Sequence, residues 1–220
     1  MIYMKRPHII INCAMSADGK IALPSRKQFR ISCDEDIERM YKLRNESDAV
    51  LVGIETILLD DPKLTVKEKY VKNPRQPIRV ILDSECRTPE NALAVNDRAK
   101  SLIITIKECF KKFNDNVKII KCTEGENGFI DLKCLLELLF NHGIKTLMVE
   151  GGGTVIWSFI KSGFVDDLYV YVAPIIVGGK NTPTIADGEG IKSLDELKHL
   201  KIVNVSKLGQ GVLFHYRLII

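Results

Sequence analysis

Residues 147–160 read LMVEGGGTVIWSFI, which is an apolar run, three glycines and a second apolar run. The first run fits a buried strand, and the second has the spacing of a helix. A glycine turn between a strand and a helix is typical of a βα unit in a parallel sheet. Such a turn can hold a phosphate at the helix N-terminus, or it can be only a tight corner. Both interpretations stay open, since Ile156 breaks the dinucleotide motif G-x-G-x-x-G and no Gly-Lys-Ser/Thr follows.

Further βα units are predicted along the chain from the same alternation of apolar runs and turn residues. The predicted strands span 8–15, 19–23, 48–53, 77–84, 101–105, 117–122, 144–150 and 166–176. The predicted helices span 32–47, 54–61, 107–113, 131–143 and 153–163. Ser32 and Glu35 have the spacing of a capping box at the start of the first helix.

The C-terminal stretch 200–220, LKIVNVSKLGQGVLFHYRLII, differs because it alternates, turns through Gly209-Gln210-Gly211 and returns. This pattern predicts an antiparallel hairpin. The sequence therefore predicts an α/β fold, in which a mixed, mainly parallel sheet carries helices on both faces and ends in that hairpin. No stretch has the composition of a linker, so we expect a single domain over 1–220.

The composition narrows the class of protein. The 220 residues carry a net charge of only +4, with no basic block that would indicate nucleic-acid binding. The N-terminal apolar run is too short to span a membrane or to form a signal-peptide core, which favours a cytoplasmic protein. The six cysteines form no C-x-x-C pair, so we expect reduced, buried thiols. The four histidines are scattered, and we expect no metal site.

Polar residues follow three of the predicted strands. In an open α/β sheet, ligands bind at the carboxyl ends of the strands. The residues at these ends are Gly53, Thr56, Asp60 and Asp61; Asp83 and Ser84; and Glu150, Gly151, Gly152, Gly153 and Thr154. Asn12, inside the first strand, is either a hydrogen-bonded core amide or a ligand contact. Ser16 begins the turn sequence Ser-Ala-Asp-Gly, which favours a β-turn whatever else it does.

Four segments together resemble the reductases of riboflavin biosynthesis, both the archaeal and fungal stand-alone enzymes and the reductase domain of the bacterial bifunctional deaminase/reductase. They are NCAMSADGKIA (12–22), DAVLVGIETILLDDPKLTV (48–66), RVILDS (79–84) and VEGGGT (149–154). The second segment carries the most specific pattern, V-G-x-x-T-x-x-x-D-D-P-x-L-T. The resemblance runs from about residue 8 to the C-terminus.

This resemblance implies a dihydrofolate-reductase-like fold and an NADPH-dependent reaction, with NADH as the alternative cofactor. The ribosyl group of an aminopyrimidine 5′-phosphate would become ribityl, by hydride transfer to C1′ of the ring-opened imine. It also implies a homodimer.

The resemblance assigns the strand-end residues to two ligands. The cofactor set is Gly53, Thr56, Asp60, Leu82, Asp83, Ser84, Gly151, Gly152, Gly153 and Thr154. The substrate set is Asn12, Ser16, Asp61, Leu64, Thr65 and Glu150, with Ser32 placed for the 5′-phosphate. Asp61 and Glu150 are the candidate catalytic carboxyls, and the proton donor stays unassigned. Arg87 and Lys107, just beyond two strand ends, are hypotheses for a 2′-phosphate contact.

Two features depart from the bacterial proteins. Position 12 is Asn, where those proteins usually carry Lys, so the sequence supplies no charged donor there. The zinc deaminase half, with its H-x-E and C-x-x-C motifs, is absent, so we expect reduction without deamination. Two other functions stay open, a dihydrofolate or pteridine reductase and a non-catalytic nucleotide-binding domain.

Overall fold

The computed structural model describes residues 5–27 and 29–219. These residues group into two compact units. Unit 1 contains the described residues up to His8 and Tyr41–Met148, and unit 2 contains Ile9–Met40 and the described residues from Val149 onward. Within the described ranges, no helix is both long enough and apolar enough to cross a membrane.

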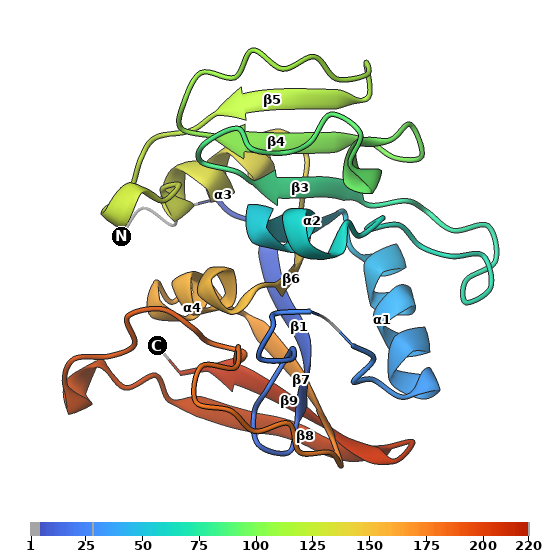
Figure 1. Ribbon diagram of the computed structural model, residues 1–220, viewed down its shortest axis with the longest axis vertical. Helices are drawn as coiled ribbons and strands as arrows, with labels where there is room; N and C mark the ends of the chain where they lie inside the picture. The colour runs from blue at the N-terminus through green and yellow to red at the C-terminus, as the bar shows by residue number, and fades with distance from the viewer. Residues whose placement is uncertain (1–4, 28, 220) are drawn as a thin grey trace. The chain divides into compact units, whose positions relative to one another are not determined.

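Unit 1 is built on parallel strands that run side by side (Figure 1). The order β5-β4-β3-β2 places Val117–Lys121, Ser101–Thr105, Ile78–Leu82 and Ala49–Gly53 next to one another. β6 (Thr146–Gly151) follows β2 in this order, and its residues up to Met148 belong to the unit. The helices are α2 (Ile54–Asp60) and α3 (Leu132–Asn141), with short 3-10 turns at Leu93–Val95 and Glu126–Gly128.

The interior of unit 1 holds an apolar cluster and, beside it, a buried arginine. Val50, Val52, Ile81 and Ile103 come from three neighbouring strands and lie in one buried cluster. The buried side chain of Arg79 donates to Ser101 Oγ at 2.9 Å and also to Asn96 Oδ1 and to three backbone carbonyl oxygens. Burial lowers the pKa of Arg79 to about 10, so the group stays protonated at neutral pH. Arg79 therefore joins β3 to the 93–101 segment.

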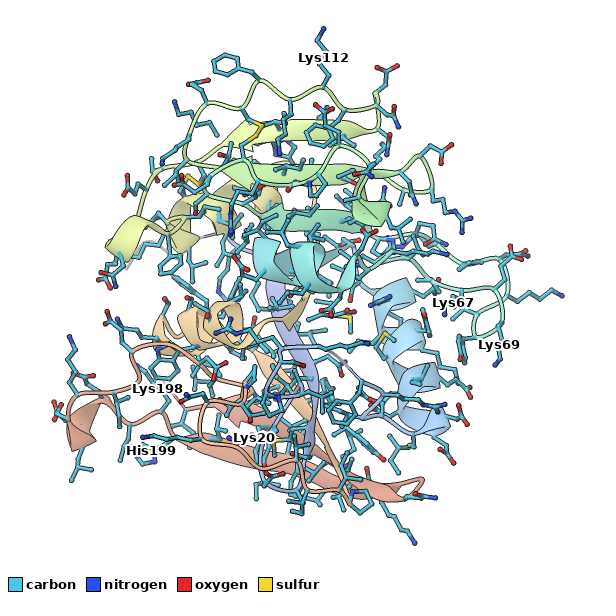
Figure 2. All side chains as sticks on the ribbon, viewed as in Figure 1. Lys20, Lys67, Lys69, Lys112, Lys198 and His199 are labelled. Carbon is cyan, nitrogen blue, oxygen red and sulfur yellow. A yellow bond between two sulfur atoms is a disulfide. The ribbon has the colours of Figure 1, made fainter. Side chains whose placement is uncertain are left out.

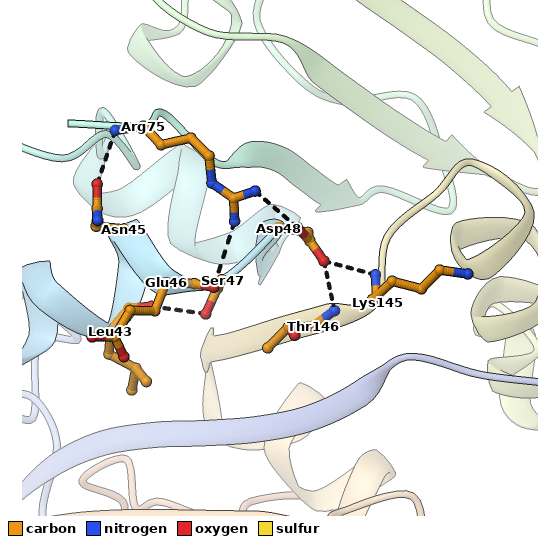
Figure 3. Close-up of polar contacts among 8 residues, drawn as sticks. All are labelled: Leu43, Asn45, Glu46, Ser47, Asp48, Arg75, Lys145 and Thr146. Atoms are coloured by element: carbon orange, nitrogen blue, oxygen red, sulfur yellow. Dashed lines mark hydrogen bonds and ion pairs between the residues drawn. The ribbon is translucent and has the colours of Figure 1, made fainter. Parts of the chain in front are cut away.

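Asp48 fixes the start of two strands in the same unit, as Figure 3 shows. Its Oδ2 accepts hydrogen bonds from the backbone N–H groups of Lys145 and Thr146, at 2.8 and 2.9 Å. Its Oδ1 pairs with Arg75 at 3.0 Å, and Arg75 N donates to Asn45 Oδ1 at 2.8 Å. One carboxylate thus ties the beginning of β2 to the beginning of β6.

Unit 2 combines parallel and antiparallel pairing. β1 (His8–Ser16) pairs in parallel with β7 (Asp167–Ala173), and β9 (Gly211–Leu218) pairs antiparallel with β7 and with β8 (Leu200–Leu208). The long β8–β9 hairpin is the red ribbon in Figure 1. α4 (Gly153–Lys161) lies in this unit, as does the first part of α1 (Asp34–Glu46), and Leu194–Glu196 forms a 3-10 turn.

The predicted fold class is confirmed. β2, β3, β4 and β5 pair in parallel, as do β1 and β7, and the C-terminal hairpin is antiparallel. The single domain expected over 1–220 stays a prediction.

Three predicted elements are wrong in detail. No helix forms over 107–113, because Lys107 N donates to Thr105 Oγ1 and Lys112 N to Glu90 Oε1, which holds this segment outside a helix. Residues 19–23 form a turn and an isolated bridge from Lys20 to Thr184 in place of a strand. α1 begins at Asp34 rather than Ser32, so the expected capping box is absent; its first turn carries three carboxylates, which suit the helix dipole.

The expectation of reduced thiols is wrong for four of the six cysteines. Cys86 is joined to Cys109, and Cys122 to Cys134, with Cα atoms 5.6 and 6.4 Å apart. Figure 2 shows both as yellow bonds. Cys13 and Cys33 are free and half-buried. Sequence spacing could not predict these pairs, because each depends on a chain reversal that brings two distant loops or elements together.

Candidate active site

The ends of β2 and β3 lie side by side in unit 1. Gly53 is the register partner of Leu82, so the turn that follows each strand begins at the same level of the sheet. Gly53 is also the residue before α2, which places Thr56 in the first turn of that helix, where it is half-buried. Two of the predicted strand ends are therefore brought together.

The carboxylate of Asp83 shapes the turn after β3. Asp83 is fully buried and accepts hydrogen bonds from Arg87 N at 2.9 Å, Thr88 N at 2.7 Å and Thr88 Oγ1 at 2.7 Å. The carbonyl oxygen of Ser84 accepts from Thr105 Oγ1 at 3.1 Å. These contacts hold the strand end in one conformation, and a cofactor contact of Asp83 stays a prediction.

Each of the two candidate cations lies beside a carboxylate. Arg87 pairs with Glu55 at 2.5 Å, and Lys107 pairs with Glu85. All four side chains are well exposed. Ion pairs of this kind contribute only about 0–1 kcal/mol, so an incoming phosphate could replace either carboxylate at small cost.

The D-D-P-x-L-T segment is held in an unusual backbone conformation. Asp61 and Leu64 have positive φ angles of 41° and 52°. Asp61 Oδ1 accepts a hydrogen bond from Leu93 N at 2.7 Å. The side chain of Leu64 is 2% exposed and packs in the unit 1 core. Positive φ in non-glycine residues is costly and is concentrated at functional sites, which makes this segment a candidate on structural grounds too.

Arg44 is a candidate that the sequence analysis missed. Its Nη1 donates to the carbonyl oxygen of Thr65 at 3.1 Å, and both residues are buried. The guanidinium also lies 5.4 Å from the ring centroid of Tyr41. The available signal was an arginine at the helical spacing of Ile37, Met40 and Tyr41, where an apolar residue is expected.

Glycine suits each of positions 151, 152 and 153 for a different reason. Gly151 has a φ of 143°, which favours glycine whatever the surroundings. A Cβ on Gly153 would lie 2.5 Å from the carbonyl oxygen of Thr184, so this position needs glycine for close packing. Gly152 precedes the first residue of α4, and no side chain caps that helix. Its N-terminal N–H groups are therefore the part of the turn suited to an anion.

The residues around this turn are partly exposed. Thr154 is exposed in the first turn of α4, and Glu150 is half-buried in β6, directly before the glycines. Ser32 is half-buried and lies two residues before the start of α1.

Ser16 is occupied by its own turn. Its hydroxyl donates to Asp18 Oδ1 at 2.6 Å and accepts from Lys20 N at 2.9 Å. Asp18 also accepts from the N–H groups of Val177 and Gly178. The Ser16 hydroxyl and these two N–H groups lower the pKa of Asp18 to about 2. The Ser16 hydroxyl is therefore already engaged within this turn, and the predicted substrate contact would have to form without breaking these hydrogen bonds.

Asn12 is 8% exposed, and its Oδ1 accepts a hydrogen bond from Arg39 Nη2 at 2.5 Å. Beside it, burial and the Asp36 carboxylate raise the pKa of Cys13 to about 12, although Arg39 opposes this shift. Cys13 is thus a thiol at neutral pH and is unsuited to nucleophilic chemistry. The described residues also contain no cluster of His, Cys, Asp or Glu that could hold a metal ion.

The comparisons with known proteins agree on one family. Residues 7–214 match the model of the RibD C-terminal domain. The chain belongs to this family. It is 41% identical to the 2,5-diamino-6-ribosylamino-4(3H)-pyrimidinone 5′-phosphate reductase of Archaeoglobus fulgidus, over 94% of this chain and 95% of that protein. The protein of the same name from Methanothermobacter thermautotrophicus is 38% identical, with 96% and 98% covered.

Solved structures of RibD-type proteins share the fold. The deaminase/reductase of Thermotoga maritima matches with a TM-score of 0.82 and 25% identity, over 97% of this chain and 57% of that one. The riboflavin biosynthesis reductase Rib7 of Saccharomyces matches with a TM-score of 0.76 and 20% identity, over 97% and 90%. The predicted dihydrofolate-reductase-like fold is therefore confirmed.

Proposed function

We propose that the chain is an NADPH-dependent reductase of riboflavin biosynthesis. It would convert the ribosyl side chain of 2,5-diamino-6-ribosylamino-4(3H)-pyrimidinone 5′-phosphate to the ribityl form. The observation that carries this proposal is the likeness, over nearly their whole length, to two archaeal proteins that bear the name of this reductase. It gives no support to the dihydrofolate-reductase or non-catalytic alternatives.

A nicotinamide cofactor, when bound, supplies the hydride for this reduction. The start of α4 fits the pyrophosphate of such a cofactor, because no side chain caps this helix and the half-buried Gly152 precedes it. Backbone N–H groups and the helix dipole would bind the anion there, and the dipole contributes about 0.3–1 kcal/mol. Thr154, exposed in the first turn, would add a hydroxyl donor.

A second group of residues would bind the rest of the cofactor. They would fix its position by backbone contacts at the ends of β2 and β3, with Gly53, Thr56 and Asp60 on one turn and Leu82, Asp83 and Ser84 on the other. Arg87 and Lys107 are the cations available for a 2′-phosphate. NADH is the alternative cofactor, since each cation already has a carboxylate partner.

The substrate would contact the second set of residues. These residues are Asn12, Ser16, Ser32, Asp61, Leu64, Thr65 and Glu150. Hydride would reach C1′ of the ring-opened imine, and the imine nitrogen, which joins C1′ to the pyrimidine, would take up one proton. Asp61 and Glu150 are the candidate carboxyls for holding that proton or for hydrogen bonding to the ribose.

A direct spectrophotometric assay of NADPH oxidation tests the proposed function. The purified protein should oxidise NADPH, followed at 340 nm, when the ribosylaminopyrimidine phosphate is added. Dihydrofolate in its place should give no oxidation. Oxidation with dihydrofolate alone would favour the pteridine-reductase alternative, and no oxidation with either would favour a non-catalytic binding domain.

We further propose that the enzyme is a cytoplasmic homodimer that joins through β8. This strand ends the order β7-β9-β8 and exposes apolar side chains along its length, which are Leu200, Ile202, Val203 and Val205 at 40–58% exposure. An exposed apolar edge strand is a site for pairing with another chain, and a second copy brings the same surface.

The dimer has a direct test. The wild type should have about twice the mass of one chain by light scattering. Val205→Asp should shift it to the monomer, whereas Lys201→Asp on the same strand leaves an apolar contact intact and should change the mass little. A monomeric wild type at micromolar concentration would contradict the dimer.

A further inference from the structure

Asn12, a nearly buried polar residue within β1, faces an arginine. Asn12 is the register partner of Tyr169 on β7, and both side chains lie beside Arg39 of α1. Arg39 Nη2 donates to Asn12 Oδ1 at 2.5 Å, and the guanidinium carbon is 5.5 Å from the centroid of the Tyr169 ring. Position 12 itself carries no charged donor, but α1 brings a guanidinium to it.

This contact determines which way the Asn12 amide points. The oxygen and nitrogen of an amide are usually assigned only from their partners. Arginine has five donors and no acceptor, so only the oxygen of Asn12 can face it. The Nδ2 group must then face the other way, with two N–H donors.

The Nδ2 group is open to a ligand. In the described part of the chain, every fully buried side-chain nitrogen or oxygen has a hydrogen-bond partner. The bond from Arg39 is the one side-chain hydrogen bond of Asn12 in that part of the chain, so Nδ2 reaches solvent although the residue is only 8% exposed. A nearly buried strand residue thus presents a pair of donors and no acceptor.

Arg39 is itself held rigidly. Its Nε and Nη2 atoms both donate to Asp36 Oδ1, at 3.0 and 2.7 Å, and Asp36 is 2% exposed. On the far side, the Tyr169 ring stacks on His215 with centroids 4.3 Å apart. A planar guanidinium fixed by a buried carboxylate and an aromatic ring has little freedom to release the amide.

We propose that Arg39 is a positioning residue for the substrate. It fixes Asn12 so that the Nδ2 donors face an oxygen acceptor of the phosphorylated pyrimidine. This inference rests on the proposed function, which assigns Asn12 to the substrate, and it adds Arg39 and Asp36 as the residues that set the polarity of that contact.

The test is a cycle of variants at positions 12 and 39, measured by calorimetric binding of the ribosylaminopyrimidine phosphate and, separately, of NADPH. Arg39→Met is made together with Asp36→Asn, so that no buried carboxylate is left without its partner. This pair should weaken substrate binding about tenfold. Adding Asn12→Ala should weaken it less than twofold further, because Arg39 acts through Asn12.

Two further variants separate positioning from a merely structural role. Asn12→Asp keeps an oxygen for Arg39 but loses the donors, so it should bind substrate at least tenfold more weakly while staying folded. Arg39→Lys keeps a donor to Oδ1 and should recover most of the affinity. NADPH affinity should change less than twofold in all of these variants.

The outcomes distinguish the two proposals. Independent effects at positions 12 and 39, full affinity in Asn12→Asp, or parallel losses of NADPH binding would each overturn the role of Arg39. NADPH oxidation by the wild type decides the proposed function separately. If the wild type binds substrate with the expected coupling between positions 12 and 39 but shows no turnover, the positioning role of Arg39 holds and the proposed reductase function is contradicted. A wild type that binds no substrate would overturn both.

Discussion

At the scale of single residues, the structure gives each glycine of the 151–153 turn a different role, which the sequence alone did not distinguish. Gly151 is needed for its φ angle and Gly153 for the approach of Thr184, so neither requires a ligand to explain it. Gly152 is the half-buried residue next to the uncapped start of α4. It is therefore the position at which a substitution reports on the cofactor.

We expect Gly152→Val to weaken NADPH binding at least tenfold, because its side chain would keep a pyrophosphate from the backbone N–H groups. The protein should stay folded at 25 °C, as judged by circular dichroism. Gly153→Ala is the contrasting variant. It should lower stability by about 1–3 kcal/mol through the contact with Thr184. Unchanged cofactor affinity in a folded Gly152→Val protein would remove the pyrophosphate assignment.

Side-chain hydrogen bonds between residues that are distant in the sequence were not predictable from it. That Gly53 and Leu82 would end adjacent strands was predictable, because each follows a run of apolar β-branched residues and precedes a turn signal. The bonds from Arg39 to Asn12 and from Leu93 to Asp61 were not. Each joins residues about 30 positions apart and depends on the rotation of a helix or the path of a loop, which no local pattern encodes.

At the scale of elements, Asp48 is the junction of β2 and β6. Partial burial raises its pKa, but the N–H groups of Lys145 and Thr146 and the charge of Arg75 lower it by more, so the pKa lies below its ordinary value of 3.8. A carboxylate with a lowered pKa stabilises the fold above its unfolded pKa, and that contribution is lost as the pH falls through the folded pKa.

We expect Asp48→Asn to reduce the free energy of unfolding by about 1–3 kcal/mol at pH 7. The difference from the wild type should shrink as the pH is lowered from about 5 to 2, since the wild-type carboxyl then becomes neutral too. Urea unfolding at several pH values measures this. Asp34→Asn, at an exposed pair with Arg30, is the control and should change little. A difference in the free energy of unfolding between wild type and Asp48→Asn that does not depend on pH would contradict the role of the charge.

Elements with a strong local pattern were predicted well, and those decided by distant contacts were not. β4 has the predicted bounds of 101–105, because five consecutive buried residues leave little choice. Residues 107–113 contain helix-forming residues, yet a disulfide at Cys109 and bonds to the 84–90 segment hold them in an irregular conformation. Tertiary contacts override weak propensity in such short segments.

At the scale of the whole molecule, the cysteines divide between the two units. Both disulfides lie in unit 1, and both free cysteines lie in unit 2. The pairs close loops with separations of 23 and 12 residues. Loops of this length correspond to about 3 kcal/mol of stabilisation per bond in the chain-entropy model.

We therefore expect a reducing agent to destabilise unit 1 selectively. With dithiothreitol, limited proteolysis should cut first within 41–148, and hydrogen exchange there should accelerate while exchange in β7 and β9 changes less. The combined variant Cys86→Ser, Cys122→Ser should reproduce this without reductant. Equal loosening of both units would contradict the assignment. Four alkylatable thiols beyond Cys13 and Cys33 in protein taken directly from cells would show that the bonds are absent there.

The hydrogen bond from Arg39 to Asn12 also has a consequence for how the sequence of this enzyme can change. An asparagine at position 12 is useful only with an arginine one turn into α1, and that arginine is tolerable only with the acid at position 36. The three positions should therefore be exchanged as a set. A lysine placed at position 12 would bring a second cation against Arg39, so the route to a lysine at that site passes first through the loss of the arginine.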